Sequence, residues 1–239
     1  MVHLSNNLSK EVTEKLNKDF LTTAFEKKEL SEITSLKISK DDIVFLKYFE
    51  SLDSLEIVSF PSISSEDMDV ICKVVPSIKN LVIKEQSALL YLDLSGFNQL
   101  ESLSLLYNDN LVSIVGVGKL KEFVFYDNKD FINTQQIVTI LNQNIYCRVT
   151  LDIIYYYSVF KCLSEIGKDV SFLTKYQWVE SVGLRKHILH VYSNDEVFEL
   201  VSQLRAIVSK YLYVSGGEVE KFGILYRWMT QNIDFVNED

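Results

Sequence analysis

Hydrophobic positions between residues 33 and 125 recur in short segments with one spacing: apolar, two residues, apolar, one residue, apolar. The last two apolar positions of each segment are separated by one residue, so we expect them to point to one side of a short strand. In two segments an asparagine follows three residues later, Asn108 and Asn128, and its side chain can bond the backbone where the chain leaves the strand. The segments begin at Ile33, Leu52, Ile78, Leu89, Leu100 and Leu120.

The middle apolar positions of the main segments are 19, 26, 22 and 20 residues apart. These intervals lie at or near the length of about 20 to 29 residues that is typical of leucine-rich repeats. The segment Leu30–Ile38, with the helix expected before it, resembles the start of internalin-like bacterial leucine-rich repeat proteins. That resemblance covers approximately residues 9–130, and it implies a solenoid whose repeats bind other proteins, often on a host or a partner cell. The middle positions are Leu36, Leu55, Leu81, Leu103 and Phe123.

Apolar patterns outside the main segments predict further elements. A helix from Ser9 to about Phe25 would cover the open end of the core, because a terminal repeat cannot bury its own face. Two short strands, Tyr91–Leu94 and Ser113–Val115, are expected on the side of the repeats opposite to the main strands.

Two more helices are predicted by their capping residues. One begins after Ser64 or Ser65 and is stopped by Pro76. The other opens at Asn133, where a capping box is expected, and runs through Leu141.

The pattern changes again toward the C-terminus. Arg148–Tyr157 is rich in β-branched and aromatic residues and predicts one last strand. From Ser158 onward the chain is expected to be helical, most clearly after the capping box Ser193-x-x-Glu196. Residues 219–235 resemble the helix before the active site of bacterial transglutaminase-like domains, in which a Cys, a His and an Asp follow that helix.

The predicted fold class is therefore α/β: a leucine-rich repeat solenoid with an N-terminal helical cap and a mostly helical C-terminal unit. The predicted domains are residues 1–29 as the cap, 30–157 as the repeats with the last strand, and 158–239 as the C-terminal unit.

Charge and hydropathy narrow the classes of partner. The net charge of -9 argues against nucleic acid or an anionic membrane as the main partner. We expect no membrane insertion, because no apolar stretch is long enough to cross a bilayer. The chain as written begins without a secretory signal, which predicts a cytoplasmic protein, or a secreted or surface protein if an export signal was removed. The acidic pair Asp41-Asp42 is expected to be solvated in a turn.

Candidate catalytic and metal-binding residues are few. Cys72, Cys147 and Cys162 fit no metal spacing, and we expect reduced, mostly buried thiols. A catalytic pairing of Cys147 or Cys162 with His187 is a much weaker interpretation. His187 and His190 would share one helical face, but no third ligand is spaced to join them. We therefore expect no catalytic residue, no metal and no cofactor.

The residues that alternate with the strand leucines form the better candidate site. On the earlier strands they are small or charged, and on the later strands they make an apolar path with an aromatic end. Contiguous exposed apolar residues often mark a protein contact. The predicted partner-binding residues are Lys37, Glu56, Val82, Lys84, Ser104, Leu106, Glu122, Val124 and Tyr126.

The predicted function is a non-catalytic protein–protein interaction module that binds a partner on the concave face of the repeats. The alternative is a truncated or decayed transglutaminase-like or cysteine-protease-like protein whose repeats select its substrate. A third reading is a structural subunit that uses its ends to oligomerise. The sequence leaves the partner and the oligomeric state open. The competing explanation for the apolar path is that the C-terminal helices fold back and cover it.

Overall fold

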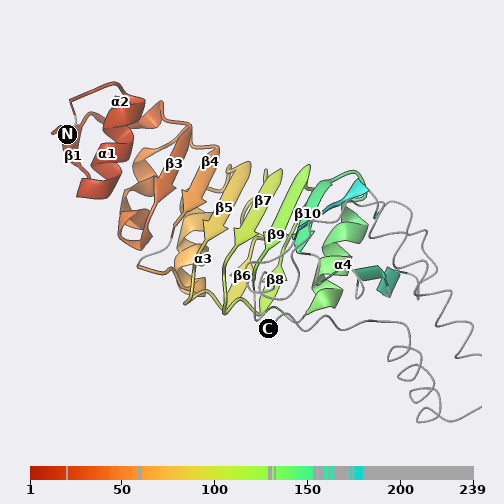
Figure 1. Ribbon diagram of the computed structural model, residues 1–239. Coiled ribbons are helices and arrows are strands. Elements are labelled where there is room, and N and C mark those ends of the chain that lie inside the picture. The colour runs from red at the N-terminus through yellow and green to blue at the C-terminus, as the bar shows by residue number, and fades with distance from the viewer. Residues whose placement is uncertain are drawn as a thin grey trace, which may run out of the picture. The chain divides into compact units, whose positions relative to one another are not determined.

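Figure 1 shows the computed structural model of the chain. The structure describes residues 1–19, 21–58, 61–128, 131, 133–152, 155, 159–160, 162–163, 173 and 175–179 of the 239-residue sequence. Helices run over α1 (Asn6–Lys15), α2 (Lys27–Ser31), the 3₁₀ helix η1 (Lys40–Tyr48), α3 (Ser65–Val74) and α4 (Thr134–Gln143). Strands run over β1 (Val2–His3), β2 (Ala24–Phe25), β3 (Ser35–Ile38), β4 (Ser54–Ile57), β5 (Asn80–Lys84), β6 (Tyr91–Asp93), β7 (Ser102–Leu106), β8 (Ser113–Val115), β9 (Glu122–Tyr126), β10 (Arg148–Asp152) and β11 (Gln177–Val179).

One parallel sheet of seven strands forms the body of this region, in the order β11-β10-β9-β7-β5-β4-β3 (Figure 1). Each strand alternates buried apolar residues with more exposed ones, which confirms the strand positions predicted from the apolar spacing. Burying one such leucine contributes about 1.5–3 kcal/mol relative to leaving it exposed. The register aligns one buried residue from each of β3, β4, β5, β7, β9 and β10: Leu36, Leu55, Leu81, Leu103, Phe123 and Val149.

The prediction of a leucine-rich repeat solenoid is wrong. The described residues form an α/β fold around the seven-stranded parallel sheet. Its connections do not repeat one unit, because the chain passes through η1 after β3, α3 after β4, β6 after β5 and β8 after β7. The uneven spacing of the strand leucines reflects these different connections, whereas a solenoid stacks like units.

A second layer packs behind the sheet in chain order, with α3 against η1 and β6, and α4 against β8 (Figure 1). The two short strands predicted at Tyr91 and Ser113 are β6 and β8, and they pair in parallel. Ser64 caps α3, and its side chain accepts a hydrogen bond from the backbone N–H of Asp67. Asn133 caps α4. Both predicted cap residues are confirmed, and each fixes where a second-layer helix begins. The capping box expected at Asn133 is not formed, because the side chain of Gln136 bonds β8 instead.

The N-terminal segment differs from its prediction. The helix α1 is capped by Ser5 and not by Ser9, which lies inside the helix and is 2% exposed. The helix ends at Lys15, well before Phe25, and Asn17 then takes a positive φ of 50°. Residues Ala24–Phe25 form β2, which pairs with β1. The sequence pattern missed β1 because a two-residue strand shows no alternation.

The C-terminal part of the described chain also differs. The predicted last strand, Arg148–Tyr157, is β10 and ends at Asp152. A further strand, β11, extends the sheet beyond β10 inside the region expected to be helical. The capping box at Ser193 and the segment 219–235 lie outside the described residues. Within the part of the chain that the structure describes, no helix is both long and apolar enough to cross a membrane.

Candidate protein-interaction surface

The strand residues that alternate with the buried ones lie on one side of the sheet, which we call the outward sheet face. Lys37 is exposed, and the other predicted partner-binding residues are partly exposed. All of them lie on this face because side chains alternate along a strand. The outward sheet face comprises Ser35, Lys37, Ser54, Glu56, Asn80, Val82, Lys84, Ser102, Ser104, Leu106, Glu122, Val124, Tyr126, Arg148, Thr150 and Gln177.

The strand register arranges these residues in rows across the sheet. Residues that pair in neighbouring strands have side chains close enough to interact. A central row runs through Lys37, Glu56, Val82, Ser104, Val124, Thr150 and Gln177. A second, shorter row runs through Lys84, Leu106 and Tyr126. The predicted residues are therefore brought together in space, although they are spread over about 90 positions of the chain.

The β3–β5 end of the outward sheet face is charged. The Glu56 carboxylate lies between two lysines, with its Oε1 atom 2.8 Å from Lys84 Nζ and 3.8 Å from Lys37 Nζ. These side chains are 30% to 53% exposed. Solvent-exposed ion pairs contribute only about 0–1 kcal/mol to stability. The cluster therefore matters more for the electrostatic pattern of the surface than for the fold.

The part of the face on β7 and β9, in the middle of the sheet, is apolar and aromatic. Leu106 pairs with Tyr126, and Val124 lies two residues before Tyr126 on the same side of β9. The ring of Tyr107 packs against the ring of Tyr126 edge to face, with centroids 5.5 Å apart and an angle of 85° between the rings. Edge-to-face aromatic pairs contribute about 0.5–1.5 kcal/mol beyond the area they bury.

Tyr107 was not among the predicted residues. It follows β7 directly and has a positive φ of 58°, so the regular alternation of the strand does not place its side chain. The left-handed conformation is costly for a residue with a Cβ atom. The signal in the sequence was the position of Tyr107 immediately before Asn108, where the chain leaves the strand.

Arg148 was also missed, because the predicted face ended at β9. Arg148 pairs in register with Glu122, and its Nε atom lies 3.5 Å from Glu122 Oε1. Glu122 also accepts a hydrogen bond from the hydroxyl of Ser102 at 3.2 Å. The guanidinium side chain is 81% exposed. It adds a cation to the β10 end of the face that the sequence analysis did not include.

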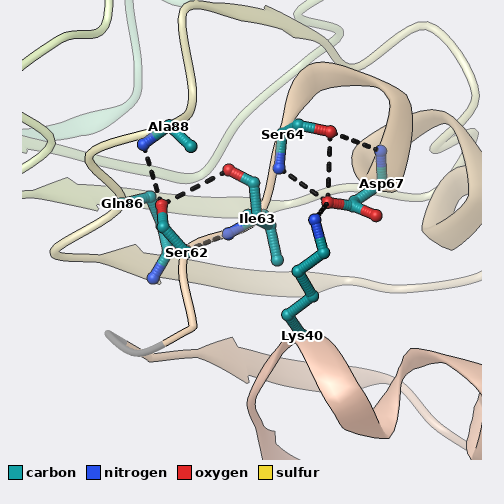
Figure 2. Close-up of polar contacts among 7 residues, drawn as sticks. All are labelled: Lys40, Ser62, Ile63, Ser64, Asp67, Gln86 and Ala88. Atoms are coloured by element: carbon teal, nitrogen blue, oxygen red, sulfur yellow. Dashed lines mark hydrogen bonds and ion pairs between the residues drawn. The ribbon is translucent and has the colours of Figure 1, made fainter.

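A buried polar ladder lies beneath the ends of the strands and fixes where the chain turns. The carbonyl Oδ1 of Asn128 accepts the backbone N–H of Asn108, and Oδ1 of Asn108 accepts the backbone N–H of Gln86. The Oε1 atom of Gln86 continues the ladder by accepting the N–H of Ile63 at 2.8 Å (Figure 2). The sequence predicted the two asparagines but missed Gln86, which occupies the same place after β5.

The residue before each ladder side chain is left-handed. Glu85, Tyr107 and Asp127 have φ values of 56°, 58° and 49°. The ladder side chains bond the backbone at these turns, which offsets the strain. This arrangement places Tyr107 beside Tyr126, so the buried ladder positions part of the outward sheet face.

The cysteines have the properties of buried structural thiols. Cys72 and Cys147 are buried, Cys162 is partly exposed, and all three are unbridged. Burial, and to a smaller extent the charge of nearby carboxylates, raises the pKa of Cys72 and of Cys147 to about 11. A catalytic cysteine needs the opposite shift. His187 and His190, the candidate base and metal ligands, lie outside the described residues.

One predicted solvated carboxylate is buried. Asp42 is 2% exposed, and its side chain accepts hydrogen bonds from the backbone N–H and the hydroxyl of Ser39, both at 2.9 Å, and from the hydroxyl of Ser5. It therefore joins the start of α1 to the start of η1.

Within the described ranges, no three acidic, His or Cys side chains are grouped so that they could hold a metal ion.

Comparison of the chain with known protein families, with curated proteins and with solved structures finds no match. The resemblances to internalin-like proteins and to transglutaminase-like domains therefore have no support beyond the residues that suggested them.

Proposed function

We propose that this chain is a non-catalytic protein-interaction module that binds a protein partner on the outward sheet face. The observation that carries the proposal is the alignment of apolar and aromatic side chains on β7 and β9, in the middle of that face. Leu106, Val124 and Tyr126 come from two neighbouring strands and remain partly exposed, with Tyr107 packed against Tyr126.

The aromatic side chains of this region suit a contact surface. Large aromatic side chains bury much area on binding and lose little conformational freedom, so they dominate the energetics of many interfaces. The edge-to-face packing of Tyr107 on Tyr126 already restrains both rings in the free protein. Covering these two rings on binding would therefore cost less rotamer entropy than covering two side chains that move independently.

The charged side chains on both sides of the apolar region would orient a bound partner. Lys37, Glu56 and Lys84 lie at the β3–β5 end, and Arg148 with Glu122 lies toward β10. Partly exposed charges at the margin of an interface change association rate and partner choice more than affinity. The apolar side chains of β7 and β9 would therefore contribute the affinity, and the flanking charges would select the partner and its orientation.

The test replaces one apolar residue on the face with a carboxylate. Partners are captured from source-cell lysate and culture supernatant with the full chain, with Leu106→Asp, and with Val44→Asp as the matched control. Val44 is 65% exposed and lies on η1, away from the outward sheet face. We expect a partner that the wild type and Val44→Asp retain and Leu106→Asp loses. Tyr126→Ala should weaken the same partner.

Two results would contradict the proposal. One is full retention of every specific partner by both Leu106→Asp and Tyr126→Ala. The other is a fall in the free energy of unfolding of Leu106→Asp by several kcal/mol, with Val44→Asp unchanged. That fall would show that another part of this chain covers Leu106 in the free protein.

A further inference from the structure

Side chains from neighbouring helices bond the backbone at both edges of the small sheet of β6 and β8. On the β6 edge, the hydroxyl of Ser65 accepts the backbone N–H of Tyr91 at 3.1 Å and donates to its carbonyl at 2.6 Å. Ser65 is the first residue of α3. This hydroxyl occupies the hydrogen-bonding groups that an added strand would use on that side.

The β8 edge faces α4, which bonds β8 at one point and the chain after β8 at another. Gln136 of α4 accepts the backbone N–H of Ile114 at 2.9 Å. Asn144, which ends α4, accepts the N–H of Leu120 at 2.6 Å and donates to the carbonyl of Gly118 at 3.3 Å. Between these two points the helix makes no hydrogen bond to the backbone of residues 115–117 within the described part of the chain.

Two backbone groups in this interval point toward α4. The carbonyl of Val115 accepts the N–H of Leu94, on the β6 side. Because a trans peptide places its C=O and N–H on opposite sides, the N–H of Gly116 points away from β6. The carbonyl of Ile114 lies on the same side as its own N–H, which bonds Gln136.

A pocket of about 340 Å³ lies at this interval, between the end of β8 and α4. Its size is at the lower end of the range of about 300–1,000 Å³ that is common for ligand sites. Its lining is apolar with a few amide and hydroxyl groups, and it includes no charged side chain. The lining includes Ile114, Val115, Gly116, Gln136, Thr139 and Ile140.

We propose that this pocket binds a short extended segment of another polypeptide, which adds to the edge of β8 as a parallel strand. In a parallel pair, one residue donates to the carbonyl before its partner residue and accepts from the N–H after it. A residue opposite Val115 would meet the Ile114 carbonyl and the Gly116 N–H in that way. An antiparallel strand would need the Ile114 N–H as well, and Gln136 already occupies it.

The lining also defines the chemistry of the segment. The bound residue would lie beside Val115, which is 48% exposed, and its neighbours would face Ile140 of α4. Without a charged group in the lining, a charged side chain would lose its hydration with no partner. The expected segment is therefore uncharged and apolar. This site is separate from the outward sheet face, which lies on the main sheet.

The test follows the backbone amide of Gly116 by ¹H–¹⁵N NMR of the full chain. The probe is the blocked peptide Ac-Ser-Val-Leu-Val-Ser-NH₂. The control peptide has the same sequence with its three apolar residues N-methylated. N-methylation removes the N–H groups that would donate a hydrogen bond to the Ile114 carbonyl. We expect the Gly116 signal to move downfield with the first peptide and to saturate in the millimolar range. The N-methylated peptide should leave it unchanged.

Two variants separate this site from the other surface. Thr139 is exposed on α4 and lines the pocket, so Thr139→Trp should fill the pocket and weaken peptide binding at least about ten-fold. Tyr126→Ala alters the outward sheet face and should leave peptide binding unchanged. Three results would overturn the proposal: no change at Gly116, equal binding of the N-methylated peptide, or a Gly116 amide already protected from hydrogen exchange in the free protein. The last would mean that this chain itself occupies the edge.

Discussion

The Oδ1 atom of Asn128 accepts two hydrogen bonds from Asn108, one from its backbone N–H and one from its side-chain amide, each at 3.0 Å. The same Asn108 amide donates to the carbonyl of Ile83 at 3.1 Å, and its Oδ1 accepts the N–H of Gln86. Asn108 and Asn128 are 0% and 1% exposed. Because water cannot reach these groups, each depends on its protein partner.

Replacing Asn108 with leucine keeps the approximate volume of the side chain and removes its polar groups. The Ile83 carbonyl and the Gln86 N–H would then be buried without a partner, at about 1–3 kcal/mol for each group. We expect Asn108→Leu to lower the free energy of unfolding by at least about 2 kcal/mol, measured by urea denaturation. The matched control is Asn110→Leu, because Asn110 is exposed and makes one bond to the Ser87 carbonyl. Equal losses in the two variants would contradict the role given to the ladder.

Glu85 is exposed and has a left-handed φ of 56°, which is costly for any residue with a Cβ atom. Glycine takes this conformation without that cost. We expect Glu85→Gly to raise the free energy of unfolding by up to about 1 kcal/mol, seen as a higher urea midpoint. The control, Glu32→Gly, replaces an exposed glutamate with an ordinary φ of -88° and should give no gain. An equal gain in both variants would show that the backbone conformation is not the cause.

Asp67 joins two helix starts in Figure 2, because its Oδ2 atom accepts the Ser64 N–H at 2.8 Å and lies 2.7 Å from Lys40 Nζ. Burial alone would raise the pKa of this carboxyl, but the hydrogen bonds from Lys40 and Ser64 outweigh it and lower the pKa. Since the folded pKa lies below the unfolded value of about 3.9, this stabilisation is present above that pH. It is lost as the pH falls through the folded pKa.

We therefore expect Asp67→Asn to lower the free energy of unfolding at pH 7, and the difference from wild type to shrink below about pH 4. Urea denaturation at both pH values measures it. Asp69→Asn, at an exposed position on the same helix, is the control and should have little effect at either pH. A difference for Asp67→Asn that stays constant with pH would show that its carboxylate charge does not stabilise the fold.

The thiols of Cys72 and Cys147, with pKa values raised to about 11, should react slowly with iodoacetamide in the folded protein. At pH 8 we expect labelling about a hundred-fold slower than in urea, where the ordinary thiol pKa is about 8.5. Cys162 is partly exposed and should be labelled first. Peptide mass spectrometry of timed samples resolves the three sites. Rapid labelling of Cys147 in the folded protein would contradict this prediction and would support the hypothesis that Cys147 is a nucleophile.

Local patterns were enough to predict the strands from β3 to β9 and the caps of α3 and α4. Alternation of apolar residues depends on strand geometry alone, and a cap bonds its own helix within three residues. The same locality explains the errors. Ser9 is a residue type that often caps helices, but Ser5 caps α1. The hydroxyl of Ser5 also bonds Asp42, which is distant in the sequence.

The fold class could not be read in the same way. Similar apolar spacing was compatible with a repeated unit, but the connections change from the 3₁₀ helix η1 to the helix α3 and then to the short strands β6 and β8. The partner-binding role of the outward sheet face stays a prediction, although the register brings its residues together. Tyr107, Gln86 and Arg148 join the site or its support through turns and pairings that no local pattern encodes.

The sequence by itself determined which residues of the strands from β3 to β9 are buried, because a period of two assigns alternate side chains to opposite faces. Only the tertiary structure decided that Leu106 lies beside Tyr126, that Gln86 continues the asparagine ladder and that β11 extends the sheet. Those relationships join residues about 20 or more positions apart, and they depend on how the intervening chain turns.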